Sequence, residues 1–195
     1  NASPFTTSKS FERDHVTLSR VNETKLPLVY LNRTGGQDEL IFDGSSFALN
    51  HDGNKFFCSS EFKEEVSIID FTKENEKWIG SGNLDKNTSE TERLYKALVL
   101  GLRDYVINNK FSGVVLGLSG GIDSALVAAI ATDAFGSEMV QAIMLPSPFT
   151  GEESLKDAKE AANLLKIKFS NLEISDAMKI VDKTLGKFNG KSFSP

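Results

Sequence analysis

The segment GVVLGLSGGIDSALVAAIATDAFG, residues 113–136, decides the fold of the second half of the chain. It begins with a short apolar run of the kind found in buried strands and ends with a longer apolar run that suits a helix. Glycines, serines and an aspartate separate the two runs. We therefore predict a strand over 114–118, a helix over 122–134 and a tight polar turn between them.

The same alternation of strands and helices continues after this segment. The further predicted elements are strands over 139–145 and 167–173 and helices over 152–166 and 175–186. Thr150 with Glu153 forms a capping-box pattern for one of these helices, and Ser175 can cap the next. Alternation of this kind predicts an α/β fold, in which an open parallel sheet is flanked by helices, over residues 90–195.

The first half of the chain has a different pattern. A helix is expected over 10–24 and a strand in the segment LPLVYLNR, and Asp52 with Gly53 marks a hairpin turn between two apolar runs. Residues 72–88 are polar and lack periodicity, as interdomain connections often do. We therefore predict domains over 1–72 and 89–195 with a linker over 73–88. Ser89 and Glu92 form a capping box at the start of the second domain.

Composition restricts the classes of protein that need to be considered. The chain has 195 residues, of which 39% are hydrophobic and 25% charged, and its net charge is −5. These values are typical of a globular protein, and no block of Lys or Arg indicates a nucleic-acid partner. No run approaches the roughly 18 apolar residues of a membrane helix, and the polar N-terminal segment lacks the apolar core of a signal peptide. We expect a cytoplasmic protein without nucleic-acid or membrane partners.

The turn after the first predicted strand has the chemistry of an anion site. In an open parallel sheet, ligands bind beyond the carboxyl ends of the strands, where this turn lies. Gly120 and Gly121 allow successive backbone N–H groups to face one concavity, and the following helix adds the positive end of its dipole. Ser119 and Ser124 add hydroxyl groups. Phosphate is the expected ligand.

Asp123 is unexpected beside a phosphate, because like charges repel. A magnesium ion between them removes the difficulty, since Mg²⁺ binds one or two carboxylates together with substrate phosphates. The alternative is that Asp123 and Ser124 only favour the first helical turn, and the spacing alone leaves both interpretations open. The motif lacks the G-K-[ST] of a Walker A loop and is not G-x-G-x-x-G, which argues against kinase-like transfer and dinucleotide binding.

The motif SGGIDS after a buried strand resembles the pyrophosphate loop of the ATP pyrophosphatases. Residues 94–136 and 142–165 resemble the glutamine-dependent NAD synthetases throughout. NASPF at 1–5 and residues 26–53 resemble the C-terminal part of the nitrilase-like glutaminase that is fused to those enzymes. The resemblance implies an adenine nucleotide alpha hydrolase-like sheet preceded by the C-terminal part of an α+β nitrilase-like sandwich.

This resemblance also implies an activity and a set of site residues. The activity is ATP-dependent amidation of deamido-NAD to NAD through an acyl-adenylate, with Mg²⁺ as cofactor and ammonia taken from glutamine, in an expected homo-oligomer. The implied ATP-binding residues are Gly117, Leu118, Ser119, Gly120, Gly121, Ile122, Asp123, Ser124, Met144 and Leu145. Asp123 would hold the metal, and Ser3 and Lys9 would contact glutamine. By itself, Met144 is more typical of a core residue, and Ser3 and Lys9 of a polar loop.

The sequence also departs from the family's pattern. The nucleophilic Cys, Glu and Lys of the glutaminase would lie upstream of NASPF, and Cys58 shares a strand face with Phe56, which is typical of a small buried residue. The chain also ends before the family's later acidic magnesium ligand. We therefore expect the middle part of a longer enzyme, and we assign no catalytic nucleophile. The alternatives are another ATP-pyrophosphatase amidotransferase, such as GMP synthetase, or an inactive nucleotide-binding fragment.

Overall fold

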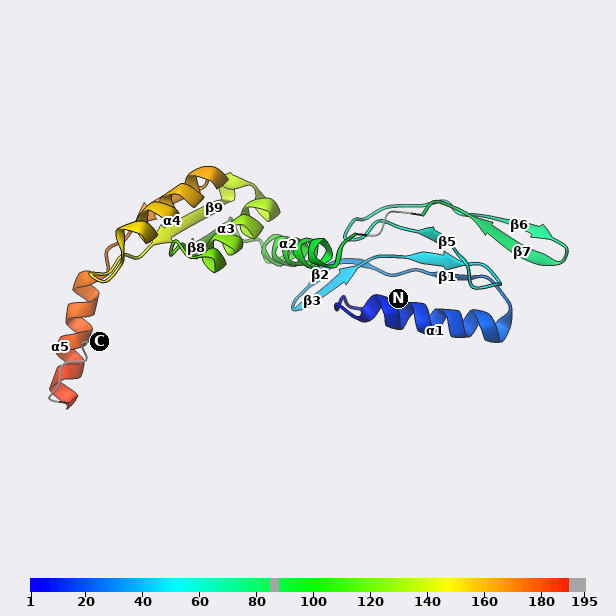
Figure 1. Cartoon of the computed structure of the whole chain (residues 1–195), viewed down its shortest axis with the longest axis horizontal. Helices are drawn as coiled ribbons and strands as arrows, with labels where there is room; N and C mark the ends of the chain where they lie inside the picture. The colour runs from blue at the N-terminus through cyan, green and yellow to red at the C-terminus, as the bar shows by residue number, and fades with distance from the viewer. Residues whose placement is uncertain (85–87, 190–195) are drawn as a thin grey trace. The chain divides into compact units, whose positions relative to one another are not determined.

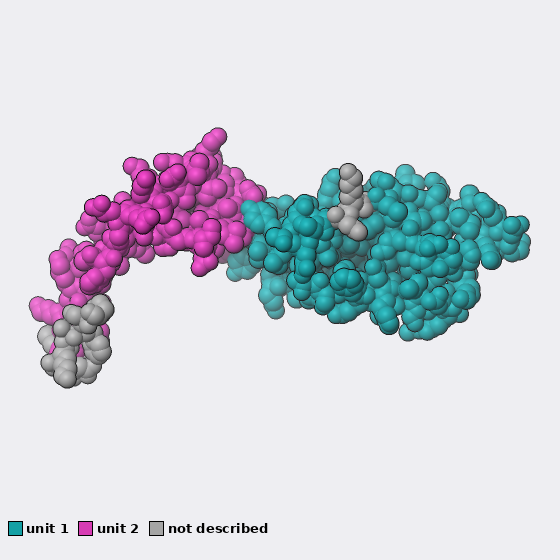
Figure 2. Space-filling model, in the orientation of Figure 1, with its two compact units in different colours: residues 1–110 teal, residues 111–195 magenta. Residues whose placement is uncertain are grey.

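The computed structural model describes residues 1–84 and 88–189, which fall into two compact units, residues 1–110 and 111–195 (Figures 1 and 2). The first contains α1 (Lys9–Thr24), β1 (Leu28–Tyr30), β2 (Thr34–Gln37), β3 (Leu40–Asp43), β4 (Phe47–Leu49), β5 (Lys55–Cys58), β6 (Asp70–Glu74), β7 (Lys77–Ser81) and α2 (Glu90–Asn108). The second contains β8 (Val114–Gly117), α3 (Ile122–Phe135), the 3-10 turn η1 (Ser137–Met139), β9 (Val140–Met144), α4 (Glu152–Leu165), β10 (Lys168–Asn171) and α5 (Ser175–Asn189).

The centre of the first unit is an antiparallel sheet with strand order β1-β4-β5, against which α1 packs. Val21 from the helix and Phe47 from β4 lie in the core, and Tyr30 stacks on Phe47 with ring centroids 5.1 Å apart. The predicted hairpin turn is confirmed between β4 and β5. Gly53 has a φ of +87°, a conformation that glycine adopts without strain.

The helix α2 packs on the hairpin formed by β2 and β3. A Cβ atom on Gly101 would lie 2.7 Å from Ile41 Cδ1, and Gly36 N donates a 2.7 Å hydrogen bond to Asp104 Oδ2. Glycines thus let the helix and the hairpin approach closely. By packing, α2 belongs to the first unit, although the sequence order placed it in a domain over 89–195. The family domain boundaries remain a prediction.

The first part of the predicted linker over 73–88 has regular secondary structure, and its role as an interdomain connection stays a prediction. Residues 70–81 form the β6–β7 hairpin, in which Thr72 pairs with Ile79. Its turn uses Asn75 and Glu76 at positive φ, and a ring contact between Phe56 and Phe71 holds the hairpin on β5. The strands are too short and too polar for a clear two-residue period, and contacts with Phe56 and Asn50, whose Oδ1 accepts from Gly80 N at 2.7 Å, help to hold them in place. Residues 85–87 of the expected linker lie outside the described residues.

The second unit is an α/β structure around a parallel sheet with strand order β10-β9-β8, as predicted. The helices α3 and α4 contact each other and pack on β9, whose Val140, Ala142 and Met144 are buried. Val115 of β8 lies on the face of the sheet opposite the buried Val140, and it is 66% exposed. The helices therefore cover one face of the sheet.

The predicted helix caps had mixed outcomes. Ser89 caps α2, since its Oγ accepts a 3.3 Å hydrogen bond from Glu92 N. Thr150 was wrong as a cap, because Gly151 precedes α4 and the Thr150 hydroxyl instead accepts from Ser147 N at 2.9 Å. Ser175 was also wrong as a cap, because it is the first helical residue of α5 rather than the residue before it.

Candidate functional site

The turn over residues 117–124 joins β8 to α3 at the carboxyl edge of the parallel sheet. Leu118 anchors it: its side chain is buried, and its N–H donates a 3.0 Å hydrogen bond to Ile143 O of the neighbouring strand β9. Ser119, Gly121 and Asp123 are exposed. The turn therefore starts from a fixed point in the sheet and presents its polar residues to solvent.

The two serines of the turn bond to each other and to its backbone. Ser119 N donates to Ser124 Oγ at 3.1 Å, Ser124 Oγ donates to Gly121 O at 2.9 Å, and Gly121 N donates to Ser119 Oγ at 3.3 Å. Both hydroxyls thus shape the turn, a role that the sequence did not reveal. The first N–H groups of α3 lack partners inside the helix, so they are the donors best suited to an anion.

The structure requires glycine at position 120 but not at position 121. Gly120 has a φ of +86°, and a Cβ there would collide with the Ser154 backbone, with the Ser154 Cα atom only 2.9 Å away. The fold itself therefore requires this glycine. Gly121 has a φ of −81°, and its Cβ would lie 3.5 Å from Ser119 Oγ, an ordinary contact. Because the fold tolerates a side chain at 121, its absence leaves room for the close approach of a ligand.

A shallow depression of about 260 Å³ brings the turn together with the end of β9. It is lined by Gly117, Leu118, Ser119, Ile143, Met144, Leu145 and Thr150. The structure thus places the start of the predicted loop beside both predicted residues of the second strand. Met144 is 3% exposed, as a core residue would be, whereas Leu145 is 49% exposed. Thr150 also lines this depression, whereas the sequence pattern pointed to it only as a helix cap.

Asp123 lies in the first turn of α3, and its carboxylate makes no hydrogen bond or ion pair with the residues that the structure describes. Across residues 1–84 and 88–189, no group of three His, Cys, Asp or Glu side chains could hold a metal ion. Mg²⁺ that is shared with phosphates needs only one or two carboxylates. The exposed carboxylate beside the helix N-terminus fits such an ion.

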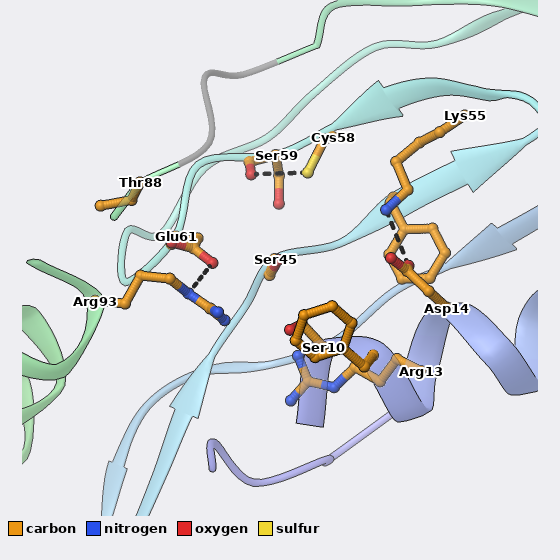
Figure 3. Close-up of a pocket in the computed structure, with 12 residues that line it drawn as sticks. Ser10, Arg13, Asp14, Ser45, Lys55, Cys58, Ser59, Glu61, Thr88 and Arg93 are labelled. Carbon is orange, nitrogen blue, oxygen red and sulfur yellow. Dashed lines mark hydrogen bonds and ion pairs between the residues drawn. The ribbon is translucent and has the colours of Figure 1, made fainter. Parts of the chain in front are cut away.

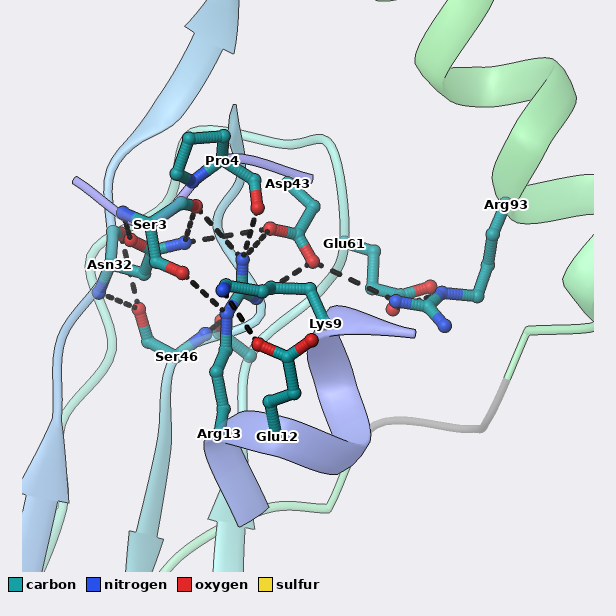
Figure 4. A network of polar contacts seen from close by, with 11 residues as sticks. Ser3, Pro4, Lys9, Glu12, Arg13, Asn32, Asp43, Ser46, Glu61 and Arg93 are labelled. Atoms are coloured by element: carbon teal, nitrogen blue, oxygen red, sulfur yellow. Dashed lines mark hydrogen bonds and ion pairs between the residues drawn. The ribbon is translucent and has the colours of Figure 1, made fainter. Parts of the chain in front are cut away.

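The two predicted glutamine contacts lie in the first unit, within a network of polar groups (Figure 4). Ser3 is half-buried and bonds to Arg13 and Asn32. Lys9 Nζ donates a 2.7 Å hydrogen bond to Glu12 Oε2, which lowers the pKa of Glu12 below its ordinary value. A ligand carboxylate that binds Lys9 would therefore compete with Glu12. Arg13 bonds to both Ser3 and Asp43. The sequence did not reveal these contacts, because Asp43 is 30 residues away from Arg13.

The first unit contains a hollow of about 300 Å³ whose lining includes Cys58, Lys55 and Glu61 (Figure 3). These are the three residue types of a nitrilase-like triad. Lys55 Nζ pairs with Asp14 at 2.9 Å, and Glu61 Oε1 pairs with Arg93 Nε at 2.7 Å. Cys58 Sγ donates to the carbonyl oxygen of the next residue. The lysine and the glutamate are engaged with other side chains, so the hollow is not arranged as a nucleophilic site.

The chain is similar to known proteins along nearly its whole length. A family model described as NAD synthase matches residues 94–193. A glutamine-dependent NAD(+) synthetase of Acinetobacter baylyi is 42% identical over 98% of this chain and 35% of its own length, and one of Rhodobacter capsulatus is 44% identical over 95% and 34%. The chain thus spans about a third of the length of the curated relatives that it matches.

A solved structure shows the same fold. The glutamine-dependent NAD+ synthetase of Acinetobacter baumannii, in complex with adenosine diphosphate, matches the whole of this chain and 37% of its own with a TM-score of 0.92 and 38% identity. The glutamine-dependent NAD(+) synthetase of Cytophaga hutchinsonii, at 19% identity and a TM-score of 0.76, supports the fold alone. In the described part of the chain, no helix is long and apolar enough to span a membrane.

Proposed function

Since the chain belongs to the NAD synthase family, we propose that this protein amidates deamido-NAD to NAD, converting ATP to AMP and pyrophosphate and taking ammonia from glutamine. The observation that carries the proposal is the turn over 117–124, in which the fold leaves room for a side chain at position 121 but the residue is glycine. This turn lies inside the segment that matches the family.

The turn is suited to hold the phosphates of ATP. The N-terminal N–H groups of α3 and the helix dipole would bind the pyrophosphate portion, and the absent side chain at Gly121 would let it approach the backbone. Asp123 would hold Mg²⁺, which when bound would neutralise charge on the departing pyrophosphate. Leu145 and the end of β9 would border the adenine. The remaining implied ATP contacts, Leu118 and Ile122 among them, come from the same turn.

The reaction needs no covalent nucleophile from this chain. An oxygen of the nicotinate carboxylate would attack the α-phosphorus of ATP, and the bond to pyrophosphate would break. Ammonia would then attack the acyl carbon of the adenylate, AMP would leave, and the nitrogen would lose a proton to form the amide. The turn would contribute by positioning and by electrostatic stabilisation of the leaving pyrophosphate.

The first unit supports the glutamine part of the proposal. We assign Ser3 and Lys9 as contacts of substrate glutamine, and residues 1–72 and 89–195 as parts of a glutaminase and a synthetase domain joined by 73–88. A cytoplasmic homo-oligomer is the assembly that we expect. The family match favours NAD synthesis over the GMP synthetase alternative.

The test is turnover by the full-length protein with Mg-ATP and deamido-NAD, supplied with either ammonia or glutamine. We expect NAD and AMP to form in equal amounts with both nitrogen donors. Amidation of xanthosine monophosphate instead of deamido-NAD would identify a GMP synthetase. ATP binding by calorimetry without turnover would leave only a nucleotide-binding protein.

Cys58 provides a separate prediction. Replacing it with serine in the full-length protein should leave glutamine-driven NAD formation within about twofold of wild type, because its neighbours Lys55 and Glu61 are engaged by Asp14 and Arg93. Steady-state rates with glutamine and with ammonia measure this. If Cys58→Ser abolished only the glutamine-driven rate, the assignment of residues 1–72 would be wrong.

A further inference from the structure

We propose that Arg13 and Asp43 are positioning residues for substrate glutamine, which they serve by fixing the hydroxyl group of Ser3. The inference rests on the proposed function, in which Ser3 contacts glutamine. It comes from the polar network of the first unit rather than from a sequence motif (Figure 4).

The loop that carries Ser3 has no regular secondary structure, yet hydrogen bonds hold it on both sides of that residue. Arg33 N donates to Asn1 O at 3.1 Å, and Phe5 N donates to Ile41 O at 2.7 Å. Between these points, Ser3 N donates to Asn32 Oδ1 at 2.9 Å. These contacts hold the backbone of the loop together with Arg13, and among the described residues Arg13 is the one that bonds to the Ser3 hydroxyl.

Arg13 reaches the loop with one side of its guanidinium group. Its Nε donates to Ser3 Oγ at 3.1 Å, and its Nη2 donates to Ser3 O at 2.8 Å and to Pro4 O at 3.3 Å. Guanidinium has no acceptor, so the hydroxyl oxygen must accept this bond and its hydrogen stays available to donate. Donation from a cation also polarises the hydroxyl. Ser3 is thus prepared to donate to an acceptor on the ligand, such as a carboxylate or an amide oxygen of glutamine.

Asp43 holds the other side of the same guanidinium group. Its Oδ2 and Oδ1 accept from Arg13 Nη1 and Nη2 at 2.9 and 2.8 Å, and Asp43 and Arg13 are only 1% and 6% exposed. Asn32 Nδ2 donates to the carboxylate at 3.4 Å, and Arg93 Nη2 lies 3.7 Å from it. A two-point pair of this kind fixes the orientation of the guanidinium group. A lysine in its place would not be oriented in this way. The buried pair therefore fixes the direction from which Ser3 is held.

The test uses Arg13→Lys in the full-length protein, with Arg20→Gln as the matched control. Arg20 lies on the same helix, is exposed and pairs only with Glu23 among the described residues. We expect Arg13→Lys to raise the KM for glutamine about tenfold, the effect of losing a hydrogen bond from a charged donor. The ammonia-driven rate should stay within twofold of wild type, and the control should match wild type in both assays.

A double-mutant cycle with Ser3→Ala separates positioning from general stability. If Arg13 acts through the Ser3 hydroxyl, the double variant should have no higher KM for glutamine than the more affected single variant. An unchanged KM in Arg13→Lys, or effects of the two variants that multiply, would overturn the inference. Where Arg13→Lys does not fold, the double variant Arg13→Met with Asp43→Leu replaces it, since it removes both buried charges together and leaves neither unpaired, and the same KM criterion applies. Absence of NAD formation by the wild type would instead refute the proposed function.

Discussion

Replacing Asp123 with asparagine should lower the ammonia-driven rate of NAD formation by the full-length protein about 100-fold or more, the size of effect seen when a strong electrostatic stabiliser is removed. Asparagine keeps the shape of the side chain, but it removes the charge that would hold Mg²⁺ and that also interacts with the dipole of α3, an effect that the control variant shares. Because the lost stabilisation develops mainly as pyrophosphate leaves, kcat should fall more than the affinity for ATP.

Asp176→Asn is the matched control for this experiment. Asp176 is also an exposed residue in the first turn of a helix of the second unit, but it pairs with Lys179 of the same helix. Steady-state rates across a magnesium titration, with ammonia as nitrogen donor, compare the two variants. An Asp123→Asn enzyme within a few-fold of wild type at every magnesium concentration would mean that this aspartate only favours the start of α3.

Replacing Gly121 with valine should weaken ATP binding by about 30- to 150-fold, which corresponds to an overpacking cost of about 2 to 3 kcal/mol at the ligand. The fold has room for the Cβ atom, whose nearest neighbour, Ser119 Oγ, would be 3.5 Å away. The melting temperature should therefore change little. Calorimetric titration with Mg-ATP, together with thermal unfolding, measures both quantities.

Two other glycines serve as comparisons. Gly151 precedes α4 as Gly121 precedes α3, with an extended backbone and open space at its Cβ position. Gly151→Val should therefore bind ATP normally. Gly120→Val should instead lower the melting temperature, because the valine would require a strained φ and would collide with the Ser154 backbone. Normal ATP affinity in Gly121→Val would show that the phosphates do not approach the turn at this residue.

The sequence by itself determined the order of elements in the second unit and the place of the turn. Strands such as Val114–Gly117 and helices such as Ile122–Phe135 are encoded by short apolar runs and local breaks, so neighbouring residues suffice to predict them. The position of the turn at the carboxyl edge of the sheet follows from the order of strand and helix alone. The hairpin at Gly53 was predictable for the same reason, since its turn chemistry is local.

Only the tertiary structure decided which residues of the sites contact one another and which of them the fold itself requires. Gly120 and Gly121 look equivalent in the sequence, and they differ because Ser154, 34 residues beyond Gly120, lies against only one of them. Arg13 and Asp43 carry no motif, and their pairing arises when α1 packs beside the end of β3. Such contacts depend on shape and charge brought together across the folded chain, whereas periodicity reports only on neighbours.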